Sequence, residues 1–394
     1  MIRTVTAIFI LTFLSTAATA QKDPYKFAQT YFGLQADGLI GSDTPNLGSA
    51  RFLIGGTHFW QKADFYISIP LVTRSLEGDN SDYKEGVITG FRYIPFGFSR
   101  KMPRPFIGAQ WLTPEIRLSD GPRLEKSRFG IEGGFNLAFG SLYTVEVSGH
   151  YLFDNDLYYP TSRESIRMIT APSYGISVAF KKYLDSTAGL SSPESKAYVQ
   201  KHFETFEEEG RLSTWNFAIG LSANVAVSDL DFLKEYSFMP NRPPLSLYPD
   251  IALGYYFHEL DAAIRVSWRP MKLSDEAYGL SYEVRQHRLA IEGFKFLFDY
   301  HGFLPFLGLS VGNDFVNAEL IDGELAKEEG QYTALSYGIT FGWDIRPTRI
   351  QNMILRTNLR YTLQSNKNVG AIGASGNNLE INFIQFVIYP SRWK

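Results

Sequence analysis

The segment Trp215–Val227, WNFAIGLSANVAV, indicates how this chain folds. Large apolar side chains such as Phe217 and Leu221 alternate in it with small or polar ones such as Asn216. Successive side chains of a β-strand point to opposite faces, so a period of two gives the strand one apolar and one polar face. The pattern recurs along the chain in segments of about ten residues, which is typical of strands that meet lipid on one side. We therefore predict an all-β protein that spans a membrane.

The second half of the chain contains the clearest of these segments. They lie at residues 249–257, 260–270, 287–298, 303–315, 334–345, 353–363 and 379–389. The connections alternate in length, with a tight turn at Asp299–Gly302 followed by an expected loop at Asn317–Gly330. Barrels with tight periplasmic turns and longer outside loops show this alternation, and an even number of strands keeps both chain ends on the periplasmic side.

The first half repeats the plan of the second. Ile88–Tyr93 matches Ile291–Phe296, and Pro105–Gly108 matches Pro305–Gly308. Residues 128–139 correspond to the strand around Gly338, and residues 143–151 correspond to the strand around Arg356. These matches predict a tandem duplication with about eight strands in each half, or about sixteen strands in total.

The composition is consistent with a barrel. Aromatic residues make up 15% of the chain, which suits the aromatic girdles of a membrane barrel. The mean hydropathy of −0.14 does not argue against it, because only every second residue of a barrel strand meets lipid. The net charge of −3 and the absence of a basic cluster exclude a nucleic-acid partner. No cysteine is present, so disulfides and thiolate metal sites are excluded.

The N-terminus has the pattern of an export signal. Arg3 precedes an apolar run from Val5 to Leu14, and Ala18–Ala20 supplies the small residues of a cleavage site. The residues between the two halves have helical character instead, because Ser192 is a good N-cap and Pro193 suits the first helical position. The expected organisation is a signal peptide at 1–20, a first eight-strand repeat at 21–184, a periplasmic linker with a short helix at 185–212, and a second eight-strand repeat at 213–394.

On these strands and loops the chain resembles the outer-membrane β-barrel proteins of Gram-negative bacteria. The resemblance implies a transmembrane antiparallel β-barrel, porin-like or made of tandem eight-stranded units. We favour one sixteen-stranded barrel, which would enclose a channel. The alternative is two eight-stranded barrels in tandem, each filled by side chains. The resemblance also implies a C-terminal aromatic signal, at Tyr389 or Trp393, for the machinery that inserts barrels.

Charged side chains on the polar faces are the candidate functional residues. They are Arg265, Arg269, Glu292, Asp314, Asp344, Arg356, Arg360, Glu132, Glu146 and His150. In a wide barrel they would line a pore and set its selectivity. In a narrow barrel they would pair into a network that holds the interior together. We expect His150 and Glu146 to share a hydrogen bond in the lumen, and not to act as an acid–base pair.

The sequence predicts neither catalysis nor a cofactor. Gly308–Gly312 matches the G-x-S-x-G pattern, but that motif needs a sharp strand-to-helix turn, and here it lies within a strand. No metal-ligand spacing is found among the histidines. We therefore expect an outer-membrane protein that passes small solutes or, alternatively, a non-conducting anchor or envelope-complex subunit. The expected partners are outer-membrane lipid, the insertion machinery, and a periplasmic or envelope protein bound through a helix at 192–209.

Overall fold

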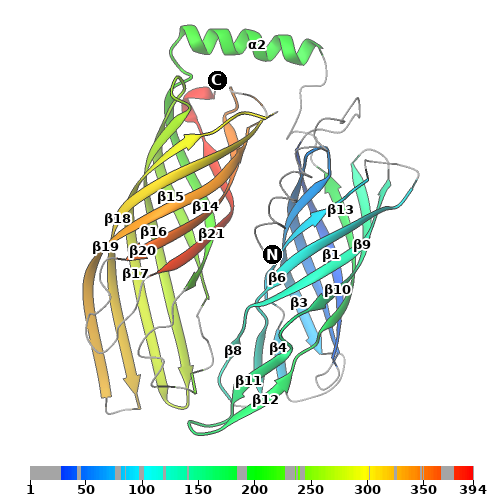
Figure 1. Cartoon of the computed structure of the whole chain (residues 1–394), viewed down its shortest axis with the longest axis vertical. Helices are drawn as coiled ribbons and strands as arrows, with labels where there is room; N and C mark the ends of the chain where they lie inside the picture. Colours follow the sequence, from blue (N-terminus) through cyan, green and yellow to red (C-terminus); the bar gives the residue numbers. More distant parts are fainter. Residues whose placement is uncertain are drawn as a thin grey trace, which may run out of the picture.

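The computed structural model shows two closed β-barrels joined by one helix (Figure 1). It describes residues 28–41, 46–75, 81–84, 86–96, 102–118, 121–139, 142–183, 193–226, 236, 238–239, 245–300, 302–323, 326–346, 348, 350–364 and 377–393. The expected signal peptide at 1–20 and the expected N-cap Ser192 lie outside these residues. The barrel formed by the N-terminal half of the chain is called barrel one, and the barrel formed by the C-terminal half is called barrel two.

Barrel one is a closed ring of eight antiparallel strands, in the order β1-β13-β10-β9-β6-β5-β3-β2. The strands are β1 (Gln29–Ile40), β2 (Leu47–His58), β3 (Ala63–Ser75), β5 (Ile88–Tyr93), β6 (Arg104–Leu112), β9 (Arg128–Phe139), β10 (Tyr143–Leu152) and β13 (Tyr174–Tyr183). The ring closes between the first and the last of these strands, with Tyr31 opposite Tyr183 and Ile40 opposite Tyr174.

Barrel two is also a ring of eight strands, in which β14 to β21 follow one another in sequence order and β21 closes on β14. The strands are β14 (Thr214–Ala226), β15 (Leu245–Phe257), β16 (Ala262–Ala277), β17 (Leu280–Phe296), β18 (Phe303–Asp322), β19 (Ala326–Ile345), β20 (Met353–Gln364) and β21 (Asn378–Ile388). The ring closes where Phe217 of β14 faces Ile388 of β21. The favoured single sixteen-stranded barrel is therefore wrong, and the tandem of two eight-stranded barrels is confirmed.

The two barrels use matching strands at matching places. β5 and β17 are the fourth strands of their rings in chain order, and β6 and β18 are the fifth. These are the pairs of segments that the sequence matches predict to be equivalent. The sixth strands, β9 and β19, and the seventh, β10 and β20, agree with the prediction in the same way. The duplication is thus visible in the topology as well as in the sequence.

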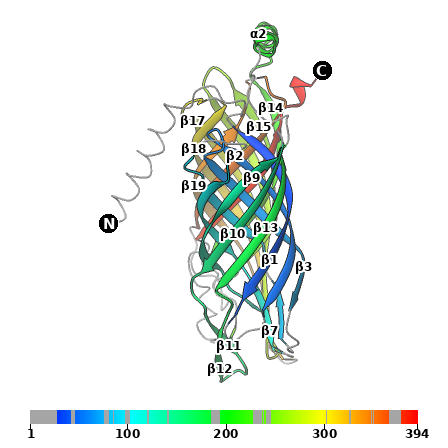
Figure 2. The ribbon, with the colours of Figure 1, turned by 90° about the vertical axis from the view of Figure 1, so that its right-hand side faces the viewer.

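The outward faces of both barrels carry the apolar residues of the alternating pattern. Trp215, Leu309 and Ile339 are 61%, 69% and 60% exposed, whereas the inward residues Asp250 and Glu292 are fully buried. This distribution is the reverse of that in a soluble protein, because large apolar side chains lie outside and charged ones lie inside. It is the pattern of a barrel surrounded by hydrocarbon. The strands run obliquely across each barrel, as Figure 2 shows for β10, β13 and β1.

Each barrel has one end with short turns and one end with long hairpins. The turn end carries the connection at 258–261, helix α2 and the C-terminus, and the hairpin end carries the β16–β17 and β18–β19 hairpins (Figure 1). The expected loop at Asn317–Gly330 is wrong, because β18 and β19 continue through most of it and pair as far as Asp322 and Ala326. Its polar residues suggested a loop, but they occupy the outer face of a strand that has left the apolar belt.

At the hairpin end of barrel two, the outward face of the strands becomes polar and the inward face becomes apolar. Along β16 the outward residues change from Ile264 and Trp268 to Lys272 and Glu276. The inward residues change from arginine to apolar side chains, and these form a buried cluster. It contains Phe238, Met239, Leu273, Ala277, Leu280, Tyr282, Val284, Val316, Ala318 and Leu320. The hairpin end is thus built like a water-soluble sheet, with its apolar residues inside.

At the hairpin end of barrel one, apolar residues are buried by separate small sheets. A three-stranded sheet contains β4 (Ser81–Lys84), β7 (Glu115–Leu118) and β8 (Leu124–Glu125), and a two-stranded sheet contains β11 (Asp156–Pro160) and β12 (Ile166–Thr170). Both add apolar residues to the core of barrel one, for example Ile116 and Leu157. Burial raises the pKa of Glu125 in β8, although Arg123, 2.6 Å away, opposes this effect.

Helix α2 (Pro193–Glu208) connects the barrels and lies beyond the turn end of barrel two (Figure 1). Its contacts with barrel two are few: Phe203 packs against His258, and the following Arg211 binds the main-chain oxygen of Ser391 in the 3-10 helix η3 (Pro390–Arg392). Gly210, with a φ of 68°, ends the helix in the left-handed conformation that favours glycine. In the described part of the chain, no helix combines the length and the apolar character needed to cross a membrane.

Candidate functional site: charge networks inside the barrels

The structure places all ten candidate residues on the inner faces of the barrels. Seven lie in barrel two and three in barrel one, where strand parity directs them inward. Nine of them are at least 96% buried, and His150 is half-buried. The interior of each barrel is therefore where the sequence concentrates its charge, and the partners of these charges determine what the interior can do.

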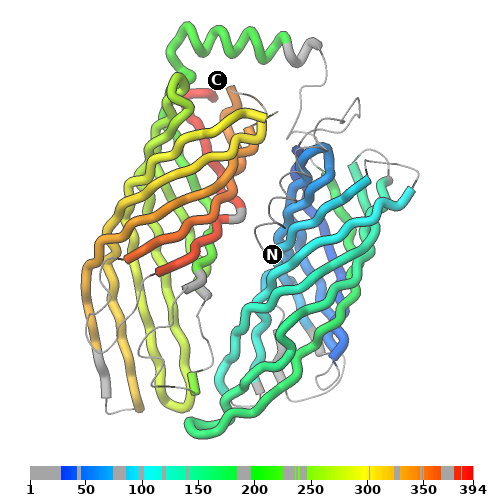
Figure 3. Tube along the Cα trace, in the orientation of Figure 1, coloured from blue at the N-terminus to red at the C-terminus, as the bar shows by residue number. Residues whose placement is uncertain are grey.

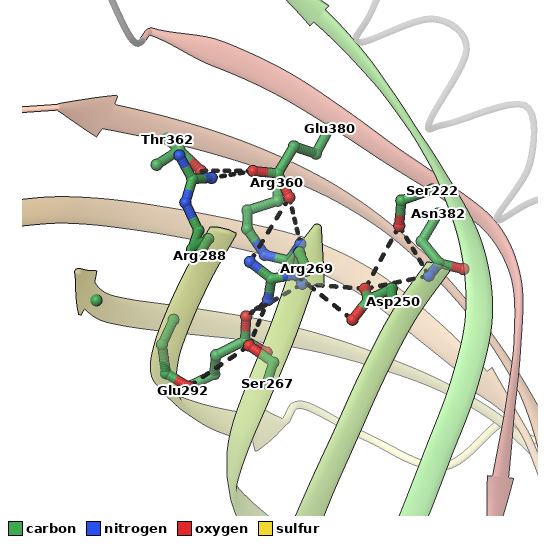
Figure 4. A network of polar contacts seen from close by, with 12 residues as sticks. Ser222, Asp250, Ser267, Arg269, Arg288, Glu292, Arg360, Thr362, Glu380 and Asn382 are labelled. Atoms are coloured by element: carbon green, nitrogen blue, oxygen red, sulfur yellow. Dashed lines mark hydrogen bonds and ion pairs between the residues drawn. The ribbon is translucent and has the colours of Figure 1, made fainter. Parts of the chain in front are cut away.

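In barrel two, Glu292 joins two arginines of the neighbouring strand. Arg265 and Arg269 of β16 both donate to its carboxylate. Ser267 accepts a further hydrogen bond from Arg269 at 2.8 Å (Figure 4). Arg360 of β20 approaches the same carboxylate to 3.2 Å. One buried carboxylate thus connects strands on two sides of the lumen.

Glu380 of β21 connects opposite walls of barrel two. Arg360 lies on the adjacent strand and donates to it at 2.7 Å, whereas Arg288 lies on β17, four strands away in a ring of eight. Arg269 of β16 approaches it to 3.6 Å. Figure 4 shows Arg269 and Arg360 side by side among these carboxylates. A direct ion pair between diametrically opposed strands means that side chains fill the lumen at this level.

The network contains as many cations as carboxylates. Asp314 binds Arg288 through two hydrogen bonds of 2.6 and 2.9 Å, and Asp344 binds Arg356 in the same way, at 2.6 and 2.8 Å. Bidentate pairs of this kind are the strongest arginine–carboxylate contacts. The members in barrel two are Arg265, Arg269, Arg288, Arg356, Arg360, Asp250, Glu292, Asp314, Asp344 and Glu380.

Three members of this network were not among the sequence candidates. They are Asp250, Arg288 and Glu380. Asp250 approaches Arg269 to 3.4 Å and also accepts from Asn382 at 3.2 Å. Strand parity alone could have found all three, since each stands an even number of residues from an inward residue of its own strand. The sequence could not show that Arg288 meets Glu380 or that Arg360 meets Glu292, because these pairs cross the lumen.

Barrel one has a smaller network around Arg92. This guanidinium lies 2.9 Å from Glu132 and 2.6 Å from Glu146, and it approaches Asp64 to 3.6 Å. Lys181 of β13 pairs with Asp64 at 3.0 Å and with Glu146 at 2.7 Å. β13 and β3 are three strands apart in the ring, so these contacts also cross the lumen.

Aromatic rings fill much of the space around the barrel-one network. Arg92 lies over the rings of Tyr66 and Phe106, with its guanidinium carbon 4.0 and 4.8 Å from their centroids. Tyr66 also donates to Glu132 at 2.9 Å. Gly90 makes room for Tyr66, because a Cβ at this position would lie 2.2 Å from the ring. Such stacking of guanidinium on aromatic faces is favourable, especially away from water.

The two catalytic patterns that the sequence raised have ordinary structural roles. Ser310 of the Gly308–Gly312 motif lies within β18 and not at a strand-to-helix turn. Glu146 forms ion pairs with Arg92 and Lys181, so it belongs to the network of barrel one. The described residues contain no group of three or more metal-ligating side chains.

No family model and no curated protein matches the chain. Among solved structures, Neisserial surface protein A is 14% identical, with 44% of this chain and 96% of that one aligned at a TM-score of 0.31. The attachment invasion locus protein Ail of Yersinia pestis is 13% identical over 44% and 96%, with a TM-score of 0.28. An outer membrane channel of Pseudomonas putida F1 is 8% identical over 94% and 99%, with a TM-score of 0.23.

The architecture itself is clear from the strands. Two closed rings, an apolar outer belt and charged interiors occur together in this chain. Its architecture is that of an outer-membrane β-barrel protein, built from two tandem eight-stranded barrels.

Proposed function

We propose that this protein is a non-conducting component of the outer membrane, whose two barrels anchor the β-structure of the hairpin end outside the cell and helix α2 in the periplasm. The observation that carries the proposal is the ion pair between Arg288 and Glu380, on opposite walls of barrel two. Eight-stranded barrels have interiors just wide enough for side chains to fill. A solute could pass only if these buried contacts opened.

Opening the network would be costly. Arg269, Arg288, Arg360 and Glu380 are all at least 99% buried, so each would lose its partners in a poorly hydrated interior. Removing one partner of a buried ion pair typically costs about 3–5 kcal/mol. Because several pairs share each carboxylate, a passage would require several such losses at once. Passage of small solutes, the other function that the sequence allows, therefore has less support than anchoring.

The hairpin end provides a surface that an anchor would display. A cavity of about 700 Å³ lies there between the barrels, with walls from barrel one, such as Arg117 and Arg123, and from barrel two, such as Glu276 and Glu319. Arg163 of barrel one also donates to Asp322 of barrel two at 2.5 Å. Charges of both signs on a rigid β-framework suit recognition of a polar molecule outside the cell.

Helix α2 is the part of the chain that we propose for contact with a periplasmic or envelope protein. Tyr198 is 60% exposed although it is a large aromatic residue, and Phe206 is buried against Arg211. The helix therefore holds Phe203 and Phe206 against the protein and offers Tyr198 to solvent. The test is capture of envelope proteins by a photoreactive group at position 198, with a group at the exposed Glu207 as the control for position.

Conductance of the refolded mature chain in a planar bilayer tests the anchoring proposal. We expect no stepwise current while the protein remains inserted, as shown by its mobility shift on heating and by sedimentation with vesicles. The matched control is a variant with two facing charges removed, Arg288→Ala with Glu380→Ala, which should leak if it folds. Stepwise current from the unmodified chain would contradict the proposal and favour a pore.

A further inference from the structure

The two barrels meet through apolar side chains near the turn end. Phe65 of barrel one lies 5.5 Å from Trp343 of barrel two between ring centroids, and Phe59 lies 5.3 Å from Phe303. Trp60 makes an edge contact with Tyr300 at 6.4 Å. The aromatic residues Phe59 and Trp60 adopt positive φ angles of 52° and 55°, which bulky residues rarely adopt. The β2–β3 turn is thus held in an unfavourable conformation that places both rings against barrel two.

Beside these contacts the barrels leave an apolar crevice of about 250 Å³. Its walls come mainly from outward-facing residues of β2 and β3 on one side and of β19, β20 and β21 on the other, with further residues from β1 and β5. They include Ile54, Phe65, Ile67, Trp343, Leu355 and Phe386. In Figure 3, β20 and β21, drawn in orange to red, run along the side of barrel two that faces barrel one. The same outward faces meet hydrocarbon elsewhere on the barrels.

Water is a poor occupant for this crevice. A buried water needs two to four polar partners, and an apolar cavity of about 150 Å³ stays dry and takes up an apolar ligand. The crevice is larger than that and is lined mainly by aliphatic and aromatic side chains. It lies within the apolar belt, so the molecules with access to it are the chains of membrane lipids.

Six polar residues also line the crevice, namely Gln29, Thr30, His58, Thr89, Arg356 and Thr357. His58, at the turn end of β2, is 92% buried, and its Nδ1 has no hydrogen-bond partner among the described residues. A buried polar atom without a partner is unfavourable, and a ligand can supply that partner. Since His58 ends its strand at the turn end, the polar part of a lipid would lie at that end, with its hydrocarbon directed towards the middle of the barrel.

We propose that the crevice binds one glycerophospholipid of the periplasmic leaflet, with an acyl chain between the barrels and its ester or headgroup region at His58. This inference rests on the membrane insertion in the proposed function but not on the absence of conductance. The turn end faces the periplasm in that proposal, and this decides in favour of a phospholipid over a lipid of the outer leaflet. The bound chain would add apolar contact near the turn end, where the two barrels meet through the rings named above.

Native mass spectrometry of the full mature chain tests the proposal. The protein is refolded into vesicles of phosphatidylethanolamine and lipid A, extracted with a mild detergent, and its bound lipids are identified by mass. The blocking variant is Gly56→Leu, because Gly56 faces outward into the crevice. The matched control is Gly133→Leu on β9, an exposed outward glycine on the opposite wall of barrel one.

We expect one phosphatidylethanolamine to remain on the unmodified chain and on Gly133→Leu, and at least a tenfold lower occupancy on Gly56→Leu. His58→Phe should lower the occupancy several-fold while keeping the ring that contacts Phe65. Equal occupancy in the two leucine variants, retention of lipid A instead, or no retained lipid would each overturn the proposal. A protein that inserts and does not conduct but retains no lipid would contradict lipid binding and leave the proposed function intact. Failure of the lipid proposal can therefore be distinguished from failure of the proposed function.

Discussion

Barrel one and barrel two share a strand plan but close their interiors with different chemistry. Barrel two uses five arginines and five carboxylates, and the contacts of Glu380 and Glu292 reach across the lumen. Barrel one pairs Arg92 and Lys181 with three carboxylates and pairs Arg51 separately with Asp37 at 3.5 Å. It fills the remaining space with Tyr66, Phe106 and other rings. In both barrels, buried charges on different walls neutralise each other. The comparison shows that different sets of residues can fill a lumen of eight strands.

The largest effect should follow from removing the central carboxylate of barrel two. Glu380→Ala removes the one carboxylate that Arg269, Arg288 and Arg360 all contact and breaks the link between opposite walls, so we expect a loss of about 3–5 kcal/mol in the free energy of unfolding. Urea unfolding in lipid vesicles measures the loss. Glu380→Gln keeps an acceptor and should lose less. If both variants were as stable as the unmodified chain, the network would not hold barrel two together.

The same kind of change in barrel one should have a smaller effect. Arg92→Met removes one cation, but Lys181 still pairs with Asp64 and Glu146, and Glu132 keeps its hydrogen bond from Tyr66. We therefore expect a loss near the lower end of the range for a broken buried pair, about 3 kcal/mol. Probes placed in each barrel should show that this variant shifts only the transition of barrel one. A loss larger than that of Glu380→Ala would reverse the comparison.

Glycines that make room for rings should be equally important in both barrels. A Cβ at Gly90 would lie 2.2 Å from the ring of Tyr66, and one at Gly308 would lie 2.4 Å from the ring of Phe294. Overpacking of this kind costs about 1–3 kcal/mol, so Gly90→Ala and Gly308→Ala should destabilise by that amount. The outward Gly133→Ala is the control, with no expected loss. Thermal unfolding of the three variants would show whether the two interiors are packed equally tightly.

The smallest effect should come from the exposed contact between the barrels. Arg163 and Asp322 keep 42% and 38% of their side-chain surface accessible, and exposed ion pairs contribute about 0–1 kcal/mol. Arg163→Ala should therefore change stability little, and the change should vanish at high salt. A double-mutant cycle with Asp322→Ala measures the coupling. A coupling energy above about 1 kcal/mol would show that the contact at the hairpin end holds the two barrels together.

The sequence was sufficient to predict which residues of most strands face outward and which face inward, because the alternation of side chains along a strand is a local property. It predicted the outward face of Trp215 and the inward face of Arg265, and it matched the two halves strand by strand. It favoured the wrong closure, since the choice between one ring and two depends on whether β1 pairs with β13 or with β21. That pairing joins residues far apart in the chain, and no local pattern encodes it.

The interior was predicted in part for the same reason. The ten candidate residues face inward, but the partners of Arg288 and Glu380 lie across a lumen whose width depends on the number of strands. The loop assigned to Asn317–Gly330 shows a second limit. Polar outward residues indicate the end of the lipid belt, and they do not indicate the end of a strand.

The closure of each ring by its own first and last strands has a consequence for how the protein is made. The seam of barrel one, between β1 and β13, is complete by Tyr183, whereas the seam of barrel two joins β14 to β21. Assembly therefore has to close two separate seams within one polypeptide. Because the ring of barrel one needs no residue beyond Tyr183, it can close before any strand of barrel two is in place.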